Sequence, residues 1–496
     1  MSTTQAPSGV KIKVYPYEDF QGIDASRDIG ALDTGQKQHM VSIVNGFADW
    51  RGSMVRDPGA IPRTEGNKYI KHVNFFGRDL AVWAQKDGGG TTLKSERGHE
   101  QLEVYPKSAV ITSTVYNNKV IFASRDYPMF QYDGFKWQEI TSGSDPRPAF
   151  VVSIQRRLAI AGAPGKRTII DFSRVDNEKV FTSDEEPTAA QVTKAADIDV
   201  ANIIGTADEI KGLGVFENNK LAVFTNDQTL VYALHPDYTQ WQIDDKANIK
   251  VGTVSHNTIV QAGADLLFCS RDGVYSMRRS ETNGITIYNI PMSNKIDLTY
   301  RALIKQVADH ETITAYFDQD EGQYHVFFPI SDKITSRLTL SLSPVQGGES
   351  KWSSGDFLNI TCGSTLGGQT LVGTPGGIWE RKRIEDETEF SPEMVVTTPI
   401  LWQGAINDTK ESYSFILQAT GQGELQVEAF DERGRYLSAM QYLIDPSGAD
   451  DNFPDVPLQR QYERKFEHRY RGVQFRFSTR GKGLLKIIGF AVTVRT

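Results

Sequence analysis

Short apolar runs separated by turns rich in Asn, Asp and Gly recur along most of the chain. The stretches Val115–Trp137 and Val215–Leu234 share one frame: an apolar pair, an Asn-Asn-Lys turn, an apolar run, a Ser/Thr-x-Asp step and an aromatic-bearing strand. The later half of that frame returns in Val251–Met277, where Leu266–Cys269 leads into Ser-Arg-Asp-Gly. Hairpin loops need positive φ, which Asn, Asp and Gly tolerate, and the flanking β-branched and aromatic residues favour strands. The pattern therefore predicts repeated β-hairpins.

The spacing of these turns is typical of propeller blades. Most steps between turn markers are close to the ~40–50 residues of one four-stranded blade, and two longer steps indicate insertions. A single hairpin cannot bury both of its faces, whereas blades stacked around an axis bury them and leave only short edges. We therefore expect a mainly β protein in which residues 61–390 form a β-propeller of about six to eight blades. The turn markers are Gly77, Asn118, Arg156, Asn219, Gly263, Gly322 and Gly368.

The longest interruption of the repeat covers residues 176–211. Acidic residues before Pro187 and an Ala-rich run after it predict a short helix, with Ser183 or Asp184 as its N-cap. The segment is either a surface insertion or a loop that reaches into a partner or a channel. In the second case the candidate gate or lumen residues are Asp184, Glu185 and Glu186.

The two ends of the chain follow a different pattern. Residues 1–60 look like neither a blade nor a disordered tail, and we expect them to wrap along other parts of the protein or a neighbouring subunit. Near the C-terminus, Phe475 and Phe477 alternate with polar residues, which is typical of a strand with one wet face. We expect residues 391–496 to form a separate β-sandwich that serves as a platform or interface domain.

Composition and charge limit the classes of function. The chain has 496 residues, of which 39% are hydrophobic and 23% charged, and a net charge of -8. No apolar run approaches the ~18 residues of a membrane-spanning helix, and the N-terminus lacks the apolar core of a secretory signal. Cys269 and Cys362 end apolar runs and are interpreted as buried residues in a reducing compartment. We therefore expect synthesis in a cytoplasm, and the acidic charge argues against a protein that grips a phosphate backbone.

Several short motifs resemble catalytic or ligand-binding sites, but each lacks a necessary part. Ala161–Thr168 lacks the spacing of a Walker loop, Tyr132–Trp137 departs from the Asp box of sialidases, and Asp318–Gly322 lacks the closing Glu of a calcium loop. The eight histidines show no metal-ligand spacing, and neither Gly-x-Ser-x-Gly nor His-Glu-x-x-His occurs in the sequence. We therefore expect no catalytic residues, no metal and no cofactor, and hence no enzyme.

One stretch near the C-terminus is unusually basic for an acidic protein. Residues 459–472 place five cations among Tyr462, Phe466 and Tyr470. Aromatics among cations occur in nucleic-acid sites, but Arg and Tyr are also enriched at protein interfaces. A solvated strand face, a protein interface and a nucleic-acid site all remain open for this stretch. The cations are Arg460, Arg464, Lys465, Arg469 and Arg471.

Two sets of residues resemble the tail nozzle proteins of short-tailed (podovirus-like) bacteriophages, also called tail tubular or packaged-DNA stabilisation proteins. Such proteins begin with a Gly-rich wrapping segment that ends in an Arg…Pro-Gly signature, matched here by Asn45, Arg51–Gly52 and Arg56–Gly59. In the middle of the propeller they carry an apolar strand, matched by Leu221–Leu234, and then a longer signature. That signature is matched by Gly252, Thr253, Val254, Ser255, Ile259, Val260, Gly263, Phe268, Ser270, Asp272, Gly273, Val274, Tyr275 and Met277.

The resemblance implies a structural virion protein of the phage tail, assembled in the host cytoplasm. It implies a homohexameric ring below the portal and its adaptor (connector), forming the distal nozzle that retains packaged DNA and lets it leave on infection. The implied partners are other copies of the chain, the adaptor ring, tail fibres or tailspikes, a distal plug or needle, and double-stranded DNA passing without sequence specificity.

The net charge fits a DNA conduit. Six chains would carry -48, six times -8, and a negatively lined lumen lets a polyanion pass. The wrapping segment and the C-terminal domain are the candidates for contacts within the ring. The candidate interface residues are Trp50, Arg51, Arg56, Arg460, Arg464, Lys465, Arg469 and Arg471.

The main alternative is a carbohydrate-binding or sialidase-like β-propeller that acts as a phage or bacterial adhesin. Trp137, Trp241, Trp352 and Trp379 are candidates for stacking on sugars, although their spacing favours blade cores. A regulatory propeller of cellular origin is the third reading, but Trp-Asp and kelch signatures are absent from the sequence.

Overall fold

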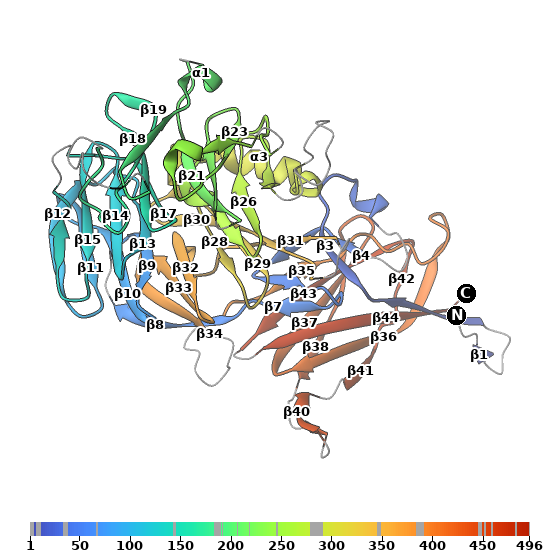
Figure 1. Ribbon diagram of the computed structural model, residues 1–496. Helices are drawn as coiled ribbons and strands as arrows, with labels where there is room; N and C mark the ends of the chain where they lie inside the picture. The colour runs from blue at the N-terminus through green and yellow to red at the C-terminus, as the bar shows by residue number, and fades with distance from the viewer. Residues whose placement is uncertain are drawn as a thin grey trace.

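Strands predominate in the computed structural model of the protein, and they gather into a propeller and a C-terminal domain (Figure 1). None of the helices in the described part of the chain has the length and apolar character needed to cross a bilayer. The structure describes residues 4–5, 11–32, 38–65, 68–141, 145–182, 190, 192–205, 207–217, 219–244, 247–277, 291–344, 349–382, 391–444, 449–450, 453–457, 460–481 and 484–495.

The propeller consists of successive antiparallel sheets whose first strands pack against one another around a common axis. Within the described residues, six of these sheets are separate and one, β28–β31, continues into the C-terminal domain. The ring closes where β32 packs against β9. The first two sheets contain β9 (Ile70–Phe76), β10 (Leu80–Lys86), β11 (Gly90–Ser95) and β12 (Glu100–Pro106), then β13 (Thr112–Tyr116), β14 (Lys119–Ser124), β15 (Tyr127–Tyr132) and β16 (Trp137–Glu139).

The remaining sheets continue the same up-and-down order. The third and fourth contain β17 (Phe150–Ile154), β18 (Arg157–Ala163), β19 (Lys166–Phe172) and β20 (Ala196–Asp199), then β21 (Gly212–Phe216), β22 (Lys220–Phe224), β23 (Thr229–Ala233) and β24 (Gln242–Ile243). The fifth contains β25 (Val260–Ala262), β26 (Asp265–Cys269) and β27 (Val274–Ser276). The last two contain β28 (Thr314–Asp318), β29 (Gln323–Ser331), β30 (Ile334–Ser341) and β31 (Lys351–Gly355), then β32 (Cys362–Leu366), β33 (Gln369–Thr374) and β34 (Gly377–Lys382).

The mainly β propeller fold is confirmed, and each predicted turn marker lies between the first two strands of one blade. At the β13–β14 turn, Asn117 and Asn118 have φ of 49° and 58°, the backbone that a two-residue hairpin requires. Gly263 and Gly322 take φ of 64° and 62° at the corresponding turns of later blades. Turn chemistry therefore marks every blade once, which is why the repeat could be read from the sequence.

The last blade is completed by a strand from the N-terminal part of the chain. β8 (Gly59–Glu65) pairs antiparallel with β34, so the two ends of the propeller are held together by backbone hydrogen bonds. Closure of this kind removes two open sheet edges that would otherwise be free to pair with other chains.

The C-terminal domain has two sheets that face each other across an aromatic core. The ring of Phe415 on β36 lies 4.9 Å from Phe475 on β43, and Phe477 lies 5.3 Å from Phe490 on β44. Arg476 between the two β43 phenylalanines is exposed, as the alternation predicted. The strands are β35 (Val395–Thr397), β36 (Lys410–Gly421), β37 (Gly423–Asp431), β38 (Tyr436–Ile444), β39 (Ala449–Asp450), β40 (Phe453–Pro457), β41 (Arg460–Lys465), β42 (Arg469–Tyr470), β43 (Val473–Arg480) and β44 (Leu485–Arg495).

Strands of the N-terminal part are distributed over both domains. β2 pairs with β44, and β7 pairs with β6 and β44, so these strands belong to the sheet that contains β36 and β41. β3 and β4 form a parallel pair of their own. The strands are β1 (Thr4–Gln5), β2 (Lys11–Tyr17), β3 (Phe20–Ile23), β4 (Gln38–Met40), β5 (Ser42–Val44), β6 (Gly46–Ala48) and β7 (Met54–Arg56).

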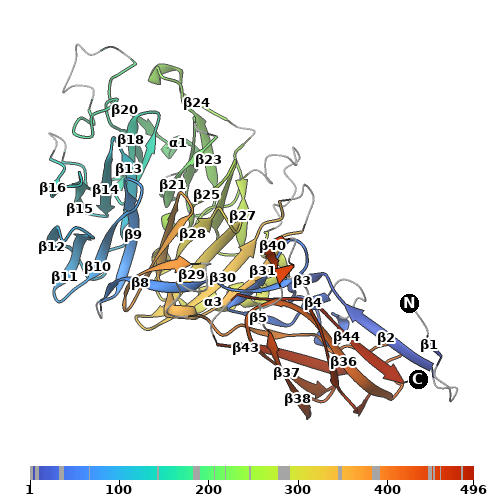
Figure 2. The ribbon, with the colours of Figure 1, turned by 90° about the horizontal axis from the view of Figure 1, so that it is seen from below.

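β5 connects the propeller to the C-terminal domain. It pairs in parallel with β31 of the propeller and antiparallel with β35, which gives one nine-stranded sheet in the order β28-β29-β30-β31-β5-β35-β43-β37-β38. Seen from below, this sheet runs from the propeller toward the red C-terminal strands at the lower right (Figure 2). The two domains therefore share backbone hydrogen bonds and not only side-chain contacts.

Two polar interactions fix the segment that follows β5. The Asp57 carboxylate pairs with the Arg337 guanidinium on β30, and both side chains are buried. Asn45, with φ of 54°, accepts hydrogen bonds from the backbone N–H groups of Asp356 (3.0 Å) and Phe357 (3.1 Å), and its amide donates to the Asp356 carboxylate (2.9 Å). Both residues hold the N-terminal chain against the β30–β31 blade.

The expected helix near Pro187, with Ser183 or Asp184 as its cap, lies outside the described residues, as do Asp184, Glu185 and Glu186. The described part of the insertion contains β20, which pairs with β19, and the single-turn helix α1 (Ala201–Ile204). A ten-residue helix, α3 (Asp297–Gln306), which the turn pattern did not predict, precedes β28.

The buried Asp57–Arg337 pair gives the first prediction. Asp57→Asn should lower the free energy of unfolding by about 3 kcal/mol, because it leaves the Arg337 cation buried without its counter-ion. Urea denaturation followed by tryptophan fluorescence measures the loss.

The matched control replaces both partners. Asp57→Leu combined with Arg337→Met should recover much of the loss, since no buried charge remains. Equal stability of Asp57→Asn and the unmodified protein would show that the pair does not hold the segment.

Candidate functional site

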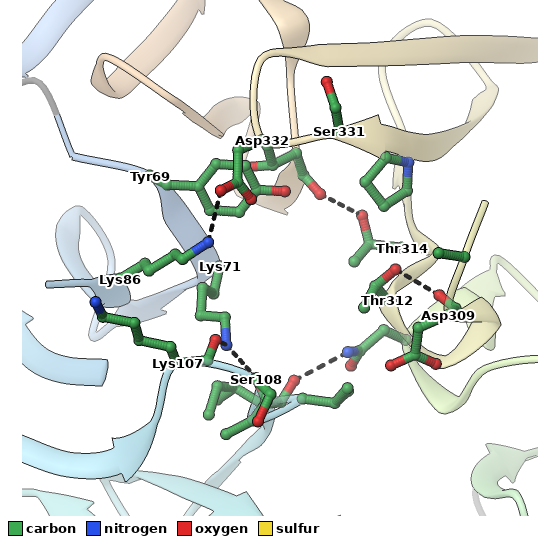
Figure 3. Close-up of a pocket in the computed structure, with 17 residues that line it drawn as sticks. Tyr69, Lys71, Lys86, Lys107, Ser108, Asp309, Thr312, Thr314, Ser331 and Asp332 are labelled. Atoms are coloured by element: carbon green, nitrogen blue, oxygen red, sulfur yellow. Dashed lines mark hydrogen bonds and ion pairs between the residues drawn. The ribbon is translucent and has the colours of Figure 1, made fainter. Parts of the chain in front are cut away.

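One mouth of the propeller axis is hollowed by two adjoining cavities. Inner strands from across the propeller converge there: Tyr69 precedes β9, Ile111 precedes β13, Thr314 lies in β28 and Thr361 precedes β32. The first cavity has a volume of about 270 Å³ (Figure 3) and the second about 260 Å³. The two together are called the hub basin, and they share Ser108, Ala109, Val110 and Asp309.

Lys71, near the start of β9, is the most unusual group of the first cavity. Its ammonium donates to the backbone carbonyl of Lys107 at 2.6 Å and to that of Ala109. None of the described carboxylates forms an ion pair with it. Burial, together with the nearby Lys86 ammonium, lowers the pKa of Lys71 to about 8. A partly buried ammonium that has no direct ion pair, with the Asp332 and Asp309 carboxylates nearby, is therefore present at the wall of an open cavity.

Lys86, at the end of β10, stands beside Lys71 and has a partner. Its Nζ is 2.7 Å from Oδ2 of Asp332, whose side chain is 70% exposed, and 5.9 Å from the centre of the Tyr69 ring. Burial raises the pKa of the Tyr69 hydroxyl above its usual range, so this phenol stays neutral. In Figure 3 the Lys86 ammonium faces Asp332, whereas the Lys107 side chain points away from the cavity.

The charged side chains that line the second cavity are paired with one another. The Glu311 carboxylate is 3.0 Å from Lys211 Nζ and 3.3 Å from the guanidinium of Arg125. Arg125 follows β14, Lys211 precedes β21 and Glu311 precedes β28, so these pairs join three blades across the basin. They stabilise the propeller and leave this half of the basin less available to a charged ligand.

Two histidines near the basin are neutral, and one of them, His256, lines its second cavity. His72 Nε2 is 2.7 Å from the Ser113 hydroxyl, and His256 Nδ1 accepts the Leu213 N–H at 3.2 Å while its ring stacks on Phe150. Burial lowers the pKa of His72 to about 4 and that of His256 to about 3. Neutral imidazoles with these contacts act as hydrogen-bonding core residues at neutral pH.

The described residues contain neither a metal-ligand cluster nor an activated thiol. In the described ranges, no cluster of His, Cys, Asp or Glu side chains is suited to hold a metal ion. Cys269 and Cys362 are buried free thiols whose pKa values burial raises to about 11 and about 12, so neither is a nucleophile at neutral pH. What the basin offers chemically is a pair of ammonium groups beside hydroxyl and carboxylate acceptors.

The residues predicted as interface candidates fall into three places. Trp50, 54% exposed, and Arg51 lie at the turn between β6 and β7, with the Arg51 guanidinium 4.8 Å from the centre of the Trp50 ring. Arg464, Lys465, Arg469 and Arg471 are exposed on and around β41 and β42, whereas for Arg460 the structure describes only the backbone, in β41.

Arg56 corrects one of these expectations. It is 2% exposed, and its guanidinium donates to the backbone carbonyls of Pro392 and Gly481, the latter at 2.8 Å. Arg56 therefore ties β7 to the C-terminal domain within one chain and is not available to a neighbouring subunit. Arg51 lies in the turn between β6 and β7, whereas Arg56 lies in β7 and faces the C-terminal domain, so only Arg51 is exposed.

The tryptophans considered for sugar stacking are all at least half-buried and pack against other side chains. Trp137 and Trp352 are buried and Trp241 and Trp379 half-buried, and the Trp241 ring lies 4.5 Å from Phe172. These contacts agree with the packing role that the spacing of the tryptophans in the sequence favoured. Lys71 could not be singled out from the sequence, because a single lysine next to an apolar run is typical of a solvated strand end.

Comparison with models of known protein families finds no match, and comparison with curated proteins finds no similar sequence. Among solved structures, the chain is similar to BamB from Moraxella catarrhalis, with 12% identity and a TM-score of 0.38 over 69% of this chain and 96% of that one. It is also similar to virginiamycin B lyase from Staphylococcus aureus, with 10% identity and a TM-score of 0.40 over 65% and 97%.

A third similar structure is the extracellular domain of a putative hybrid two-component system from B. thetaiotaomicron, with 10% identity and a TM-score of 0.42 over 95% of this chain and 67% of that one. These similarities are too distant to bear on function.

The buried histidines give a prediction on acid stability. Both titrate near 6.5 in the unfolded chain but at about 4 and about 3 in the folded protein. As the pH falls below 6.5 the unfolded state therefore binds more protons, and stability should decrease progressively toward pH 3. Thermal unfolding midpoints measured between pH 7 and pH 3 test this.

His256→Asn separates this effect from general acid unfolding, because Asn keeps an acceptor near the Nδ1 position. The variant should be less stable at pH 7, having lost the stacking on Phe150, but its midpoint should fall less steeply with acid. If the unfolding midpoint of the variant fell with decreasing pH as steeply as that of the unmodified protein, the assignment of His256 as a neutral imidazole would be wrong.

Proposed function

We propose that the chain is a structural subunit of the tail nozzle of a short-tailed bacteriophage. The observation that carries the proposal is the nine-stranded sheet in which β5 joins the propeller to the C-terminal domain. A subunit of a conduit under internal pressure has to keep its domains in fixed register, and shared backbone hydrogen bonds do so better than a flexible linker. The sequence resemblance supplies the particular assembly.

The residues of that resemblance serve packing and turn formation. A Cβ on Gly252 would collide with the backbone of Thr225 and Asn226, and one on Gly273 would lie 2.5 Å from the Pro291 ring. The Tyr275 hydroxyl donates to the Asp272 carboxylate at 2.9 Å. The signature is thus explained by the packing of two adjoining blades, which supports a structural role over a catalytic one.

A ring also needs two different, complementary surfaces on each subunit, because head-to-tail contacts repeat around the axis. The exposed Trp50–Arg51 pair adjoins β7, and the cationic group on β41 and β42 lies beyond β36; β44 pairs with both β7 and β36. These two surfaces therefore lie on opposite flanks of one sheet. We assign them to the two sides of the contact between neighbouring subunits.

The rest of the proposal follows from the assembly. A sixfold ring would form the distal end of the tail below the adaptor, contact fibres or tailspikes and a distal plug or needle, and pass double-stranded DNA through an acidic lumen. The chain would act without catalysis and reside in the virion. Residues 184–186, the proposed acidic gate, lie outside the residues that the structure describes.

Charge reversal on one flank gives a prediction on assembly. The purified protein should form a ring of six chains, and Arg464→Glu combined with Arg469→Glu should remain monomeric, since both arginines are exposed. Mass measurement by light scattering and negative-stain microscopy follow the assembly. Arg78→Glu, at the exposed β9–β10 turn, is the matched control and should assemble normally. A double variant that assembles like the unmodified protein would remove this flank from the contact.

A further inference from the structure

The first cavity of the hub basin has one cationic wall. The ammonium groups of Lys71 and Lys86 are close enough that the charge of Lys86 lowers the pKa of Lys71. An ammonium has three N–H donors, and Lys71 uses two of them on the carbonyls of Lys107 and Ala109. Lys86 uses one on Asp332. Both amines therefore keep donors for an anion placed between them.

The opposite wall offers hydrogen-bond acceptors. The hydroxyl of Thr312 already donates to the Asp309 carbonyl at 2.6 Å, and that of Thr314 donates to the Thr361 carbonyl at 2.6 Å. Because each hydroxyl proton is already used in a hydrogen bond to a carbonyl, the two hydroxyl oxygens can act only as acceptors toward a ligand. They line the cavity together with Asp309 (Figure 3). Acceptors of this kind select a ligand that carries donors, such as hydroxyl groups.

We propose that this cavity binds a small carboxylic acid that carries hydroxyl groups, the chemistry of an acidic monosaccharide. The carboxylate lies between Lys71 and Lys86, and the hydroxyl groups donate to Asp309, Thr312 and Thr314. The site is independent of the proposed structural role, because it belongs to the hub of a single chain.

The size of the cavity agrees with such a ligand. A volume of about 270 Å³ has room for one small ring-shaped molecule. The Tyr69 ring and Pro329 add apolar surface to the same wall region. A single small acid therefore fits the cavity.

Binding is expected to depend on pH through Lys71. The charged groups that act on it are Lys86 on β10, Asp332 beyond β29 and Asp309 before β28. At pH 8 about half of the Lys71 side chains are neutral, so an arriving carboxylate should draw about half a proton from the buffer. Above that pH the affinity should fall toward tenfold per pH unit.

The experiment is isothermal titration calorimetry of the full chain with D-glucuronate, in Tris and in HEPES buffer at pH 8. Glucuronate should bind, and its heats in the two buffers should differ because a proton is taken up. D-glucose lacks the carboxylate and acetate lacks the hydroxyl groups, so each should bind at least tenfold more weakly. Lack of glucuronate binding at millimolar concentration would overturn the proposal.

Variants locate the site. Lys71→Met should weaken glucuronate binding at least tenfold, and Thr312→Val should weaken it while leaving any acetate binding unchanged. Lys136→Met is the matched control and should bind normally, since Lys136 is exposed at the β15–β16 turn and does not line the cavity. Thermal unfolding shows whether Lys71→Met still folds. If it does not, the glucuronate affinity of Thr312→Val and the pH dependence of binding test the site instead.

Other outcomes contradict the ligand class. Glucose or acetate bound as tightly as glucuronate would remove the carboxylate or the hydroxyl part of the proposal. L-glutamate bound more tightly than glucuronate would assign the acceptor wall to an ammonium group and overturn the sugar-acid assignment. Binding that survives Lys71→Met unchanged would place the ligand elsewhere.

Discussion

The insertion of β5 between β31 and β35 is the constraint on which the rest of the molecule depends. It turns one propeller blade and one sheet of the C-terminal domain into a single sheet, so neither domain can rotate without breaking backbone hydrogen bonds. Asn45, directly after β5, and Asp57, just before β8, hold the chain between these two strands, and β8 then closes the propeller. A segment of about twenty residues thus sets the geometry of both domains.

The same constraint shapes the hub. Closure by β8 brings the first and last blades together, and the first cavity takes residues from both, with Tyr69, Lys71 and Lys86 from the first blade and Thr361 from the last. Asp332 and Thr314 come from the β28–β31 blade, which is fixed to the C-terminal domain. The cationic and acceptor walls of the cavity are therefore positioned by long-range pairing and not by local sequence.

The difference between local turns and long-range strand pairing explains what could be predicted from the sequence. Turns such as Asn117–Asn118 are local, because positive φ restricts the residue choice, and they marked each blade. The alternation around Phe475 and Phe477 was also local and predicted one face of β43. The pairing of β5 with β31 joins residues about three hundred positions apart, and no local pattern encodes it. The burial of Arg56 and the place of Lys71 in the cavity wall could not be predicted for the same reason, since both arise only in the assembled fold.

The central claim is that this chain forms the nozzle of a phage tail, and immunogold electron microscopy tests it most directly. Antibody raised against the purified chain is applied to phage particles from the sample that carries its gene. The account predicts label concentrated at the tail, on the side away from the capsid shell. Particles without label, or label confined to fibres, would contradict it and favour a carbohydrate-binding propeller.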